Sequence, residues 1–405
     1  MGSLATAQRS LRDPAVRHPL WPPLTAGDPV TSTDAVAYPL DVDYAYDRVP
    51  DDLFGRPAAH GLERWAPLLP PLAAPGLGEG DTPLVRLADG VWIKDESRNP
   101  TWSHKDRLNR VTVSAAVASG ARGIVVSSSG NHGASAAAYA ARAGLPCVVF
   151  TSPLAPPAVA SHVRAYGATV LTVPQESVRP FMRRIVDELG YQPVSSVTDT
   201  AHTGHPFGPE GYKTIAYEIA LALGRAPAAV HVPTGYGELL YGVAKGFLEM
   251  ARLGVTDSVP RVYAAEPAAA GALTEAMRSG ADTARVPVGP TAAYAIDCEI
   301  SGYRGVVALR ETGGTARTVT DGQMAEAQAE LAAQGLWCEL SSAAGLASLR
   351  AHGPADEDGP VVCVVTSSGY KDTATARATH APMDLEWAEV KALLTGPLAP
   401  ELRSC

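Results

Sequence analysis

The chain has 405 residues, of which 46% are apolar and 19% charged, and its formal net charge is −9. This composition is typical of a protein that buries a sizeable core, and the length suits two or three domains. An acidic chain offers no basic footprint to a polyanion, so we expect no nucleic-acid partner. No apolar run approaches the ~20 residues of a membrane span, and residues 1–12 lack the apolar segment of a signal peptide. We therefore predict a cytoplasmic protein without a membrane partner.

The cysteines give no sign of a disulfide framework or a metal site. The sequence holds Cys147, Cys298, Cys338, Cys363 and Cys405, which are scattered and show no CxxC spacing. We predict structural thiols and no metal.

Residues 1–60 are rich in Pro, Asp and aromatic residues without a sustained period, which predicts an extended N-terminal arm. Beyond Gly80, short apolar runs alternate with helical segments, which favours parallel α/β sheets. The predicted strands are 123–127, 146–150, 168–173, 228–232, 261–265 and 361–365. The predicted helices are 131–143, 155–166, 211–223, 238–253, 321–334 and a terminal helix at 384–394. The less regular stretch 191–210 predicts a crossing between domains.

Lysine is rare in this chain, with six residues against 27 arginines. Only the amine can lose its proton and act as a nucleophile, so a site that needs such chemistry cannot accept Arg. Lys105 follows the loop 99–104 and opens a predicted helix. By itself it is equally explained as an ordinary lysine at a helix start.

Three polar loops each follow a predicted strand, at 127–133, 233–238 and 366–372. The first two precede helices, whose free N–H groups and dipole favour anions, so the first loop suits a carboxylate and the second a phosphate. Neither has the GxxxxGK[ST] or GxGxxG spacing. Because ligands bind beyond the carboxyl ends of parallel strands, all three loops are expected to meet at one crevice.

Taken together, these segments resemble the threonine-synthase-like branch of the pyridoxal-phosphate enzymes with the tryptophan-synthase-β fold (fold type II). The likeness runs in order from about Gly80 to Asp372. It is carried by the segments 81–84, 92–96, 99–107, 128–133, 210–214, 233–237, 339–343 and 366–372. Because it is carried by chained motifs, it is more specific than any one pattern.

The resemblance implies a role for each matching residue. Lys105 would bind pyridoxal 5′-phosphate covalently and later move the α-proton of a small amino-acid substrate. Asn131 would contact the phenolic oxygen of the cofactor, and Thr366 the pyridine nitrogen. The remaining implied cofactor contacts are Thr234, Gly235, Tyr236 and Gly237, around the phosphate, and the implied contacts of the substrate carboxylate are Ser128, Ser129 and His132. A neutral hydroxyl at the ring nitrogen favours elimination or replacement over transamination.

Several positions depart from authentic threonine synthases. Trp102 and His104 replace a usual Gly and Phe, and His132 follows Asn131 where users of O-phosphohomoserine carry Thr. The Arg that would grip a substrate phosphate aligns with Gly208. The segment 291–304 also departs from the family and carries Asp297 and Glu299. A solvated loop is the main interpretation of these acids, and the alternative is that they favour a cationic or hydroxylated substrate side chain. His104 and His132 are open to a structural or an acid–base role.

We therefore predict a two-domain α/β protein with the cofactor in the cleft between the domains. The expected parts are an arm (1–60), a discontinuous large domain (61–100 and 205–380), an inserted smaller domain (101–204) and a C-terminal helix or tail (381–405). The predicted activity is a lyase or synthase reaction by elimination or replacement at Cβ or Cγ. The alternatives are authentic threonine synthase and a non-catalytic homologue that binds cofactor or amino acid. The family also implies a homodimer.

Overall fold

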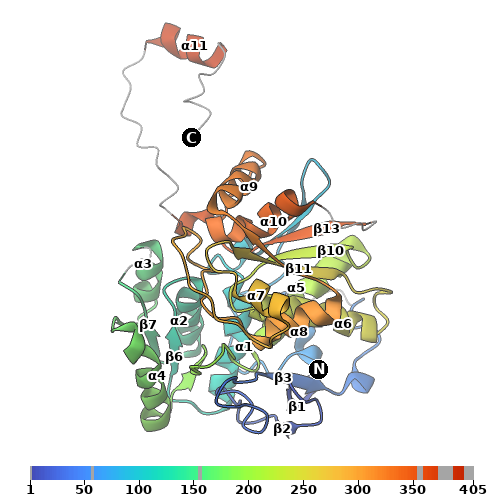
Figure 1. Cartoon of the computed structure of the whole chain (residues 1–405), viewed down its shortest axis with the longest axis vertical. Coiled ribbons are helices and arrows are strands. Elements are labelled where there is room, and N and C mark those ends of the chain that lie inside the picture. Colours follow the sequence, from blue (N-terminus) through green and yellow to red (C-terminus); the bar gives the residue numbers. More distant parts are fainter. Residues whose placement is uncertain (1, 56–58, 154–156, 354–358, 373–385, 396–405) are drawn as a thin grey trace.

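Two mainly parallel sheets and a small N-terminal sheet make up the body of the protein (Figure 1). The computed structural model describes residues 2–55, 59–153, 157–353, 359–372 and 386–395. None of the described helices is long and apolar enough to cross a membrane.

The larger sheet has six strands in the order β12-β11-β10-β13-β5-β4, and only the edge strand β4 runs antiparallel to its neighbour. Its strands are β4 (Leu84–Arg86), β5 (Trp92–Asp95), β10 (Ala229–Pro233), β11 (Arg261–Pro267), β12 (Ala316–Val319) and β13 (Val361–Val365). One apolar core joins this sheet to α5 (Gly208–Leu223), α6 (Glu238–Arg252), α7 (Ala272–Ser279) and α8 (Tyr303–Thr312). A second core joins it to α9 (Asp321–Ala333) and α10 (Ala344–His352).

The smaller sheet has four parallel strands in the order β8-β7-β6-β9. They are β6 (Ile124–Ser127), β7 (Cys147–Phe150), β8 (Thr169–Leu171) and β9 (Gln192–Pro193). Its first core includes α1 (Lys105–Ala118), α2 (Asn131–Ala143) and α3 (Pro157–Ala165), and its second includes α4 (Gln175–Leu189). These elements lie to one side of the larger sheet in Figure 1. The apolar runs are buried on both faces, which explains why they lack the polar alternation of a half-exposed strand.

The N-terminal segment contains strands that the sequence analysis did not predict. β1 (Ala5–Ser10) pairs antiparallel with β2 (Arg17–Pro19) and with β3 (Leu40–Tyr44). This sheet packs on the same chain, because Lys245 of α6 binds the Asp41 carboxylate at 2.6 Å. The pairing partner of β1 lies some thirty residues away in β3, so local sequence patterns could not reveal it.

The other predicted elements agree with the structure to within a few residues. β13 has the predicted bounds, and α2 begins and ends where expected. The predicted helix at 155–166 begins outside the described residues and is observed as α3 from Pro157. Likewise, 384 and 385 of the predicted terminal helix lie outside the described residues, and α11 spans Trp387–Thr395.

Candidate active site

Lys105 is the first residue of α1, and its amine lies 5.7 Å from the centre of the Tyr212 ring. Burial lowers the pKa of this amine, and the carboxylate of Glu238 opposes part of the shift. A lysine whose charged form is destabilised holds more of the neutral, nucleophilic amine. The position therefore suits a lysine that bonds covalently to a carbonyl compound.

Buried polar contacts fix the loop that leads into α1. The Asp106 carboxylate accepts hydrogen bonds from the backbone N–H and hydroxyl of Thr101 and from the hydroxyl of Ser135. One residue further on, the Arg107 guanidinium is buried between Glu96 and Glu218. These bonds tie the start of α1 to both sheets and leave Lys105 little freedom to drift.

The loop 127–130 and the first turn of α2 form one wall near Lys105. The hydroxyl of Ser128 accepts from the Gly130 N–H at 3.2 Å, and that of Ser129 accepts from the Ser152 N–H at 2.8 Å. The buried Nε2 atom of His132 has no hydrogen-bond partner within the described residues. Burial lowers the pKa of His132 to about 3, and the charge of Lys105 adds to the shift. His132 is therefore neutral at pH 7, so the anion-binding capacity here comes from N–H groups and hydroxyls.

Asn131 is held by charged side chains from two elements of the large sheet region. Its Nδ2 donates to the Glu339 carboxylate at 2.9 Å, while its Oδ1 accepts from Lys371 Nζ at 2.6 Å and from the Ser367 hydroxyl at 3.1 Å. Tyr294 also donates to Glu339, at 3.0 Å. An ammonium only donates and a carboxylate only accepts, so these partners fix which end of the amide faces which way. The Nδ2 atom of Asn131 contacts both oxygens of the Glu339 carboxylate.

Sequence reasoning placed Lys371 and Glu339 within family motifs but gave them no role. Burial lowers the pKa of Lys371 to about 8 and raises the pKa of Glu339 above its usual value. Their motifs, 339–343 and 366–372, were the available signal. The contact between them and Asn131 requires the fold.

The second predicted anion loop, 233–238, joins β10 to α6. Thr234 donates its hydroxyl to the carbonyl of Val232, and Gly237 has φ +88°, which favours glycine. A Cβ at Gly237 would lie 2.8 Å from the Cα of Gly305, and one at Gly235 would lie 2.8 Å from Cys298 Sγ. The loop is thus a close-packed glycine turn that leads into the N-terminus of α6, where free N–H groups suit a phosphate.

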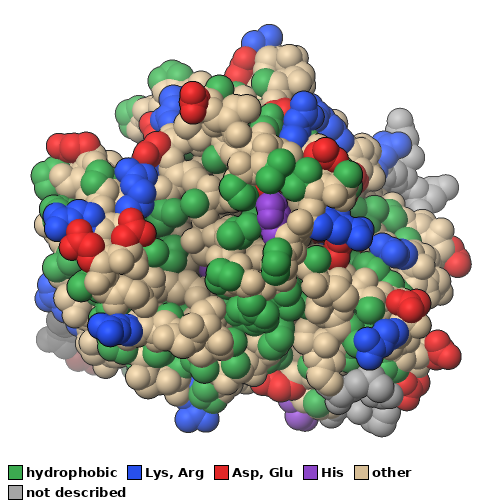
Figure 2. Space-filling view, turned by 90° about the horizontal axis from the view of Figure 1, so that it is seen from below, with side chains coloured by type: hydrophobic (Ala, Val, Ile, Leu, Met, Phe, Trp, Pro, Cys, Tyr) green, Lys and Arg blue, Asp and Glu red, His purple; other side chains and the backbone are tan. Residues whose placement is uncertain are grey.

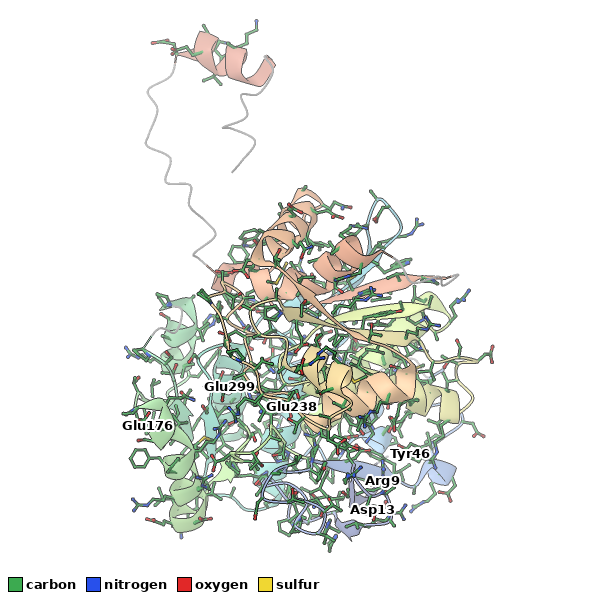
Figure 3. The ribbon with its side chains drawn as sticks, viewed as in Figure 1. Arg9, Asp13, Tyr46, Glu176, Glu238 and Glu299 are labelled. Atoms are coloured by element: carbon green, nitrogen blue, oxygen red, sulfur yellow. The ribbon has the colours of Figure 1, made fainter. Side chains whose placement is uncertain are left out.

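Glu238 and His202 are functional candidates that the sequence analysis missed. Glu238 follows the glycine loop directly, and its carboxylate lies 3.1 Å from His202 Nε2. The charges of both side chains, like that of Lys105, act on the pKa of His132, so these groups lie in one region of the protein. Figure 3 marks Glu238 near the middle of the molecule. The two residues are 36 positions apart, and no local pattern signals their pairing.

Thr366 follows β13, and its hydroxyl lies 2.8 Å from that of Ser342. Its carbonyl accepts from the backbone N–H of His104 at 2.9 Å. The His104 ring is buried against Tyr212, and burial together with the Lys105 charge holds its pKa well below its usual range. His104 Nδ1 also lies 3.1 Å from the Thr366 carbonyl, so the contacts of this ring are packing on Tyr212 and a hydrogen bond to that carbonyl.

The departures from the family have distinct structural settings. Trp102 has φ +63°, a backbone conformation that favours glycine, and its ring lies on His162 with 5.2 Å between ring centres. Glu299 is exposed and paired with Arg285, so it belongs to the solvated loop that the sequence allowed. Asp297 is half-buried, and burial raises its pKa. Gly208 opens α5, where a Cβ would lie 3.1 Å from Leu108 and 3.8 Å from the Glu238 carboxylate.

These groups fit pyridoxal phosphate. The site holds a lysine with lowered pKa, a glycine turn at a helix N-terminus, an amide oriented by charged partners and a neutral hydroxyl. In that order, these four features match the aldehyde, the phosphate, the phenolic oxygen and the ring nitrogen of the cofactor. Within the described residues, no cluster of three or more potential ligands could hold a metal ion.

Comparisons with known proteins agree with this chemistry. The family model described as pyridoxal-phosphate dependent enzyme matches residues 76–367. Threonine synthase of Methanosarcina acetivorans is 32% identical, covering 83% of this chain and 86% of its own. Threonine synthase of Halalkalibacterium halodurans is 35% identical, covering 75% and 86% respectively.

Solved structures with the same fold are more distant in sequence. L-serine ammonia-lyase from the fungus Rhizomucor miehei has a TM-score of 0.63 at 20% identity, covering 74% of this chain and 98% of its own. Threonine deaminase from Solanum lycopersicum has a TM-score of 0.61 at 19% identity, covering 78% and 88%. These likenesses show the two-domain α/β fold of type II. With its family model and its relatives, the chain belongs to the pyridoxal-phosphate-dependent enzymes, as a lyase or synthase of the threonine-synthase-like branch that acts by elimination or replacement on a small amino acid.

Proposed function

We propose that Lys105 is the residue that binds the cofactor and moves the Cα proton when the enzyme eliminates or replaces a group at Cβ or Cγ. The supporting observation is the buried amine at the start of α1, whose pKa responds to Glu238 and Cys298, two residues that adjoin the glycine turn 233–238. Once bound, pyridoxal phosphate draws electrons from the substrate Cα and so weakens its C–H bond. The amine of Lys105 takes that proton, because its lowered pKa increases the share of the neutral, basic form.

The other predicted residues receive fixed roles in this proposal. Ser128, Ser129 and the N–H groups at the start of α2 bind the substrate carboxylate, with the neutral His132 beside them. Asn131, oriented by Glu339 and Lys371, binds the phenolic oxygen. The Thr366 hydroxyl forms a hydrogen bond with the ring nitrogen and places no full charge beside it. A neutral partner at this nitrogen favours elimination or replacement over transamination.

The phosphate end of the cofactor falls to the loop after β10. Thr234, Gly235, Tyr236 and Gly237 surround the phosphate at the N-terminus of α6. The large sheet and the small sheet form the two domains with the boundaries given above. Closure of the small domain over the substrate excludes water from the site.

A second candidate is the reaction named for the relatives, threonine synthase with O-phosphohomoserine. Identities of 30–35% to proteins of that name favour it. Gly208 at the position of the phosphate-gripping Arg argues against it, because a glycine cannot replace a bidentate partner. The non-catalytic alternative is disfavoured by the presence of Lys105, Asn131 and Thr366 together.

The test begins with the purified protein loaded with pyridoxal phosphate. Borohydride reduction followed by peptide mapping should fix the cofactor on Lys105, and Lys105→Ala should abolish this labelling. The visible band of the bound cofactor should then respond to L-serine, L-threonine or L-homoserine. A response to O-phosphohomoserine alone would establish the second candidate, and no covalent capture at all would leave the binding role.

The assembly and location of the enzyme are part of the same proposal. We infer a homodimer in the cytoplasm. Support for the location comes from the acidic composition and from the lack of a spanning helix among the described ones. On the face seen in Figure 2, basic and acidic side chains lie side by side without a continuous basic area, as expected for an enzyme of small molecules.

A further inference from the structure

One end of the cleft carries charges that a phosphorylated substrate would not favour. Gly208, which stands where the family resemblance places a phosphate-gripping Arg, faces Leu108 and the Glu238 carboxylate. A side chain at this position would point toward a negative charge. The position that the resemblance assigns to a phosphate-binding guanidinium therefore carries no side chain and lies beside a carboxylate.

The Glu238 carboxylate is buried against Gly204, in space that only a glycine leaves open. A Cβ at Gly204, which has φ +60°, would lie only 1.8 Å from Glu238 Oε1, so the carboxylate fills the space of the missing side chain. Burial alone would raise the pKa of Glu238, but the hydrogen bond from His202 and the charges of His202 and Arg304 outweigh it and hold the pKa well below its usual range. Glu238 is therefore an ionised, mostly buried carboxylate.

The nearest guanidinium does not compensate for this charge at the substrate. Arg304 is buried and lies 3.8 Å from Glu238 Oε1. Its two terminal nitrogens donate to the backbone carbonyls of Thr203 and Leu40. Both arms of the fork are thus engaged away from the cleft, and Arg304 cannot grip a phosphate in the bidentate way.

His202 is oriented by Glu238 on one side and by Tyr236 on another. An ionised carboxylate only accepts, so the hydrogen of the 3.1 Å contact belongs to His202 Nε2. The imidazole stacks on the Tyr236 ring, with 3.9 Å between ring centres and 7° between planes. Within the described part of the chain, its Nδ1 has no hydrogen-bond partner. A carboxylate on one nitrogen and a free second nitrogen is the arrangement of an acid–base histidine.

We propose that His202, positioned by Glu238, is the general acid that protonates a hydroxyl leaving group, and that the substrate is a hydroxylated rather than a phosphorylated amino acid. The inference rests on the proposed function. As the C–O bond breaks, its electron pair leaves with the oxygen, which takes the Nδ1 proton of the doubly protonated His202 ring and departs as water, leaving a neutral imidazole that still donates through Nε2 to Glu238. The Cα proton goes to Lys105, so the substrate loses one water in total.

The test compares leaving groups that need a proton with one that does not. Chloride departs without protonation, so β-chloro-L-alanine is matched with L-serine, and the γ-chloro counterpart with L-homoserine. In the holoenzyme, His202→Asn should lower kcat/KM for the hydroxy substrate by about 10²–10⁴-fold. The same variant should lower kcat/KM for the chloro substrate by less than about tenfold. His352→Asn, on α10, serves as the control, and Glu238→Gln should show the same selective loss as His202→Asn, but smaller.

Each outcome has one meaning. Equal losses with both leaving groups would make His202 a structural residue and overturn the inference. Faster turnover of O-phosphoserine or O-phosphohomoserine than of their hydroxy counterparts would overturn the substrate class. Turnover of the chloro substrate by wild type would uphold elimination in either case, whereas its failure with the cofactor bound would overturn the proposed function itself.

Discussion

The two ends of the cleft differ in how completely their polar groups are satisfied. At the Asn131 end, the amide, Glu339, Lys371 and Ser367 bind one another, and no oxygen or nitrogen of Asn131 is left without a partner. At the His202 end, Glu238 Oε1 accepts no hydrogen bond within the described residues, and His132 Nε2 nearby has none either. Within the described residues, the polar atoms of Asn131 all have hydrogen-bond partners, whereas buried polar atoms of Glu238 and His132 do not.

This difference separates two tasks. Unpartnered buried polar atoms cost free energy, so a fold retains them where a ligand completes them. In the proposals above, the Asn131 end positions groups for the cofactor, which every substrate shares, and can be rigid in advance. The His202 end is proposed to contact the part that differs between substrates. The comparison can be tested by perturbing each end and a histidine outside both.

The largest effect is expected where charges are most completely paired. Arg107 binds Glu96 with two bonds of 2.7 and 2.8 Å and also binds Glu218 at 2.6 Å. Arg107→Met would leave Glu96 ionised and buried without its partner, which should destabilise the protein by about 3–5 kcal/mol. Urea unfolding measures the loss. Arg98→Met, which removes an exposed partner of Asp95, is the control and should cost less than about 1 kcal/mol. A small loss of unfolding free energy in Arg107→Met would show that these ion pairs do not hold the start of α1, which carries Lys105.

Much of the Asn131 end of the site could be predicted from the sequence, whereas the His202 end could not. α2 and β13 were predicted with their observed bounds, because glycine- and serine-rich loops flank apolar or alanine-rich runs. Lys105, Asn131 and Thr366 were found through their motifs. The His202–Glu238 pair and the contacts of Asn131 with Lys371 arise only when distant segments meet, as does the β1–β3 pairing. Sequence periods report local structure, and contacts of this range are set by the fold.

The next effect tests whether the Asn131 end acts as one unit. Lys371→Met and Glu339→Gln each remove one charge that binds Asn131. If the three groups form one network, the double variant should be more stable than the sum of single losses predicts, by about 0.5–3 kcal/mol. Unfolding of the cofactor-free proteins in urea gives this coupling energy. Additive losses would mean that the two charges hold Asn131 independently.

His231 tests whether unpartnered atoms alone indicate a substrate site. It lies in β10, stacked on Tyr263 at 4.8 Å, and neither ring nitrogen has a hydrogen-bond partner in the described structure. Burial lowers its pKa to about 3, with the Arg317 charge adding to the shift. Because the folded pKa lies below the unfolded value near 6.5, the unfolded state takes up the proton first as the pH falls. Stability is therefore lost between pH 6.5 and 3.

His231→Phe should remove this dependence and leave kcat/KM unchanged. Relative to wild type, the variant should gain about 2 kcal/mol of stability at pH 5 over its value at pH 7.5, by proton linkage. Urea unfolding at the two pH values measures the difference. The same stability difference at both pH values would contradict the buried neutral imidazole. A large loss of activity would contradict its separation from the cleft.

The smallest effect on stability and activity is expected for Glu299. The sequence analysis considered this residue, with Asp297, as a contact of the substrate side chain. The structure pairs Glu299 with Arg285 on the surface, where both side chains are about half exposed. Because solvent screens such a pair, Glu299→Gln should change stability by less than about 1 kcal/mol and leave kcat/KM for hydroxy amino acids unchanged. The informative contrast is Glu238→Gln, which removes the same charge inside the cleft. A carboxylate discriminates between substrates by its charge only where water does not screen that charge. Equal changes in kcat/KM for Glu299→Gln and Glu238→Gln would therefore mean that Glu238 is more solvated than its burial suggests.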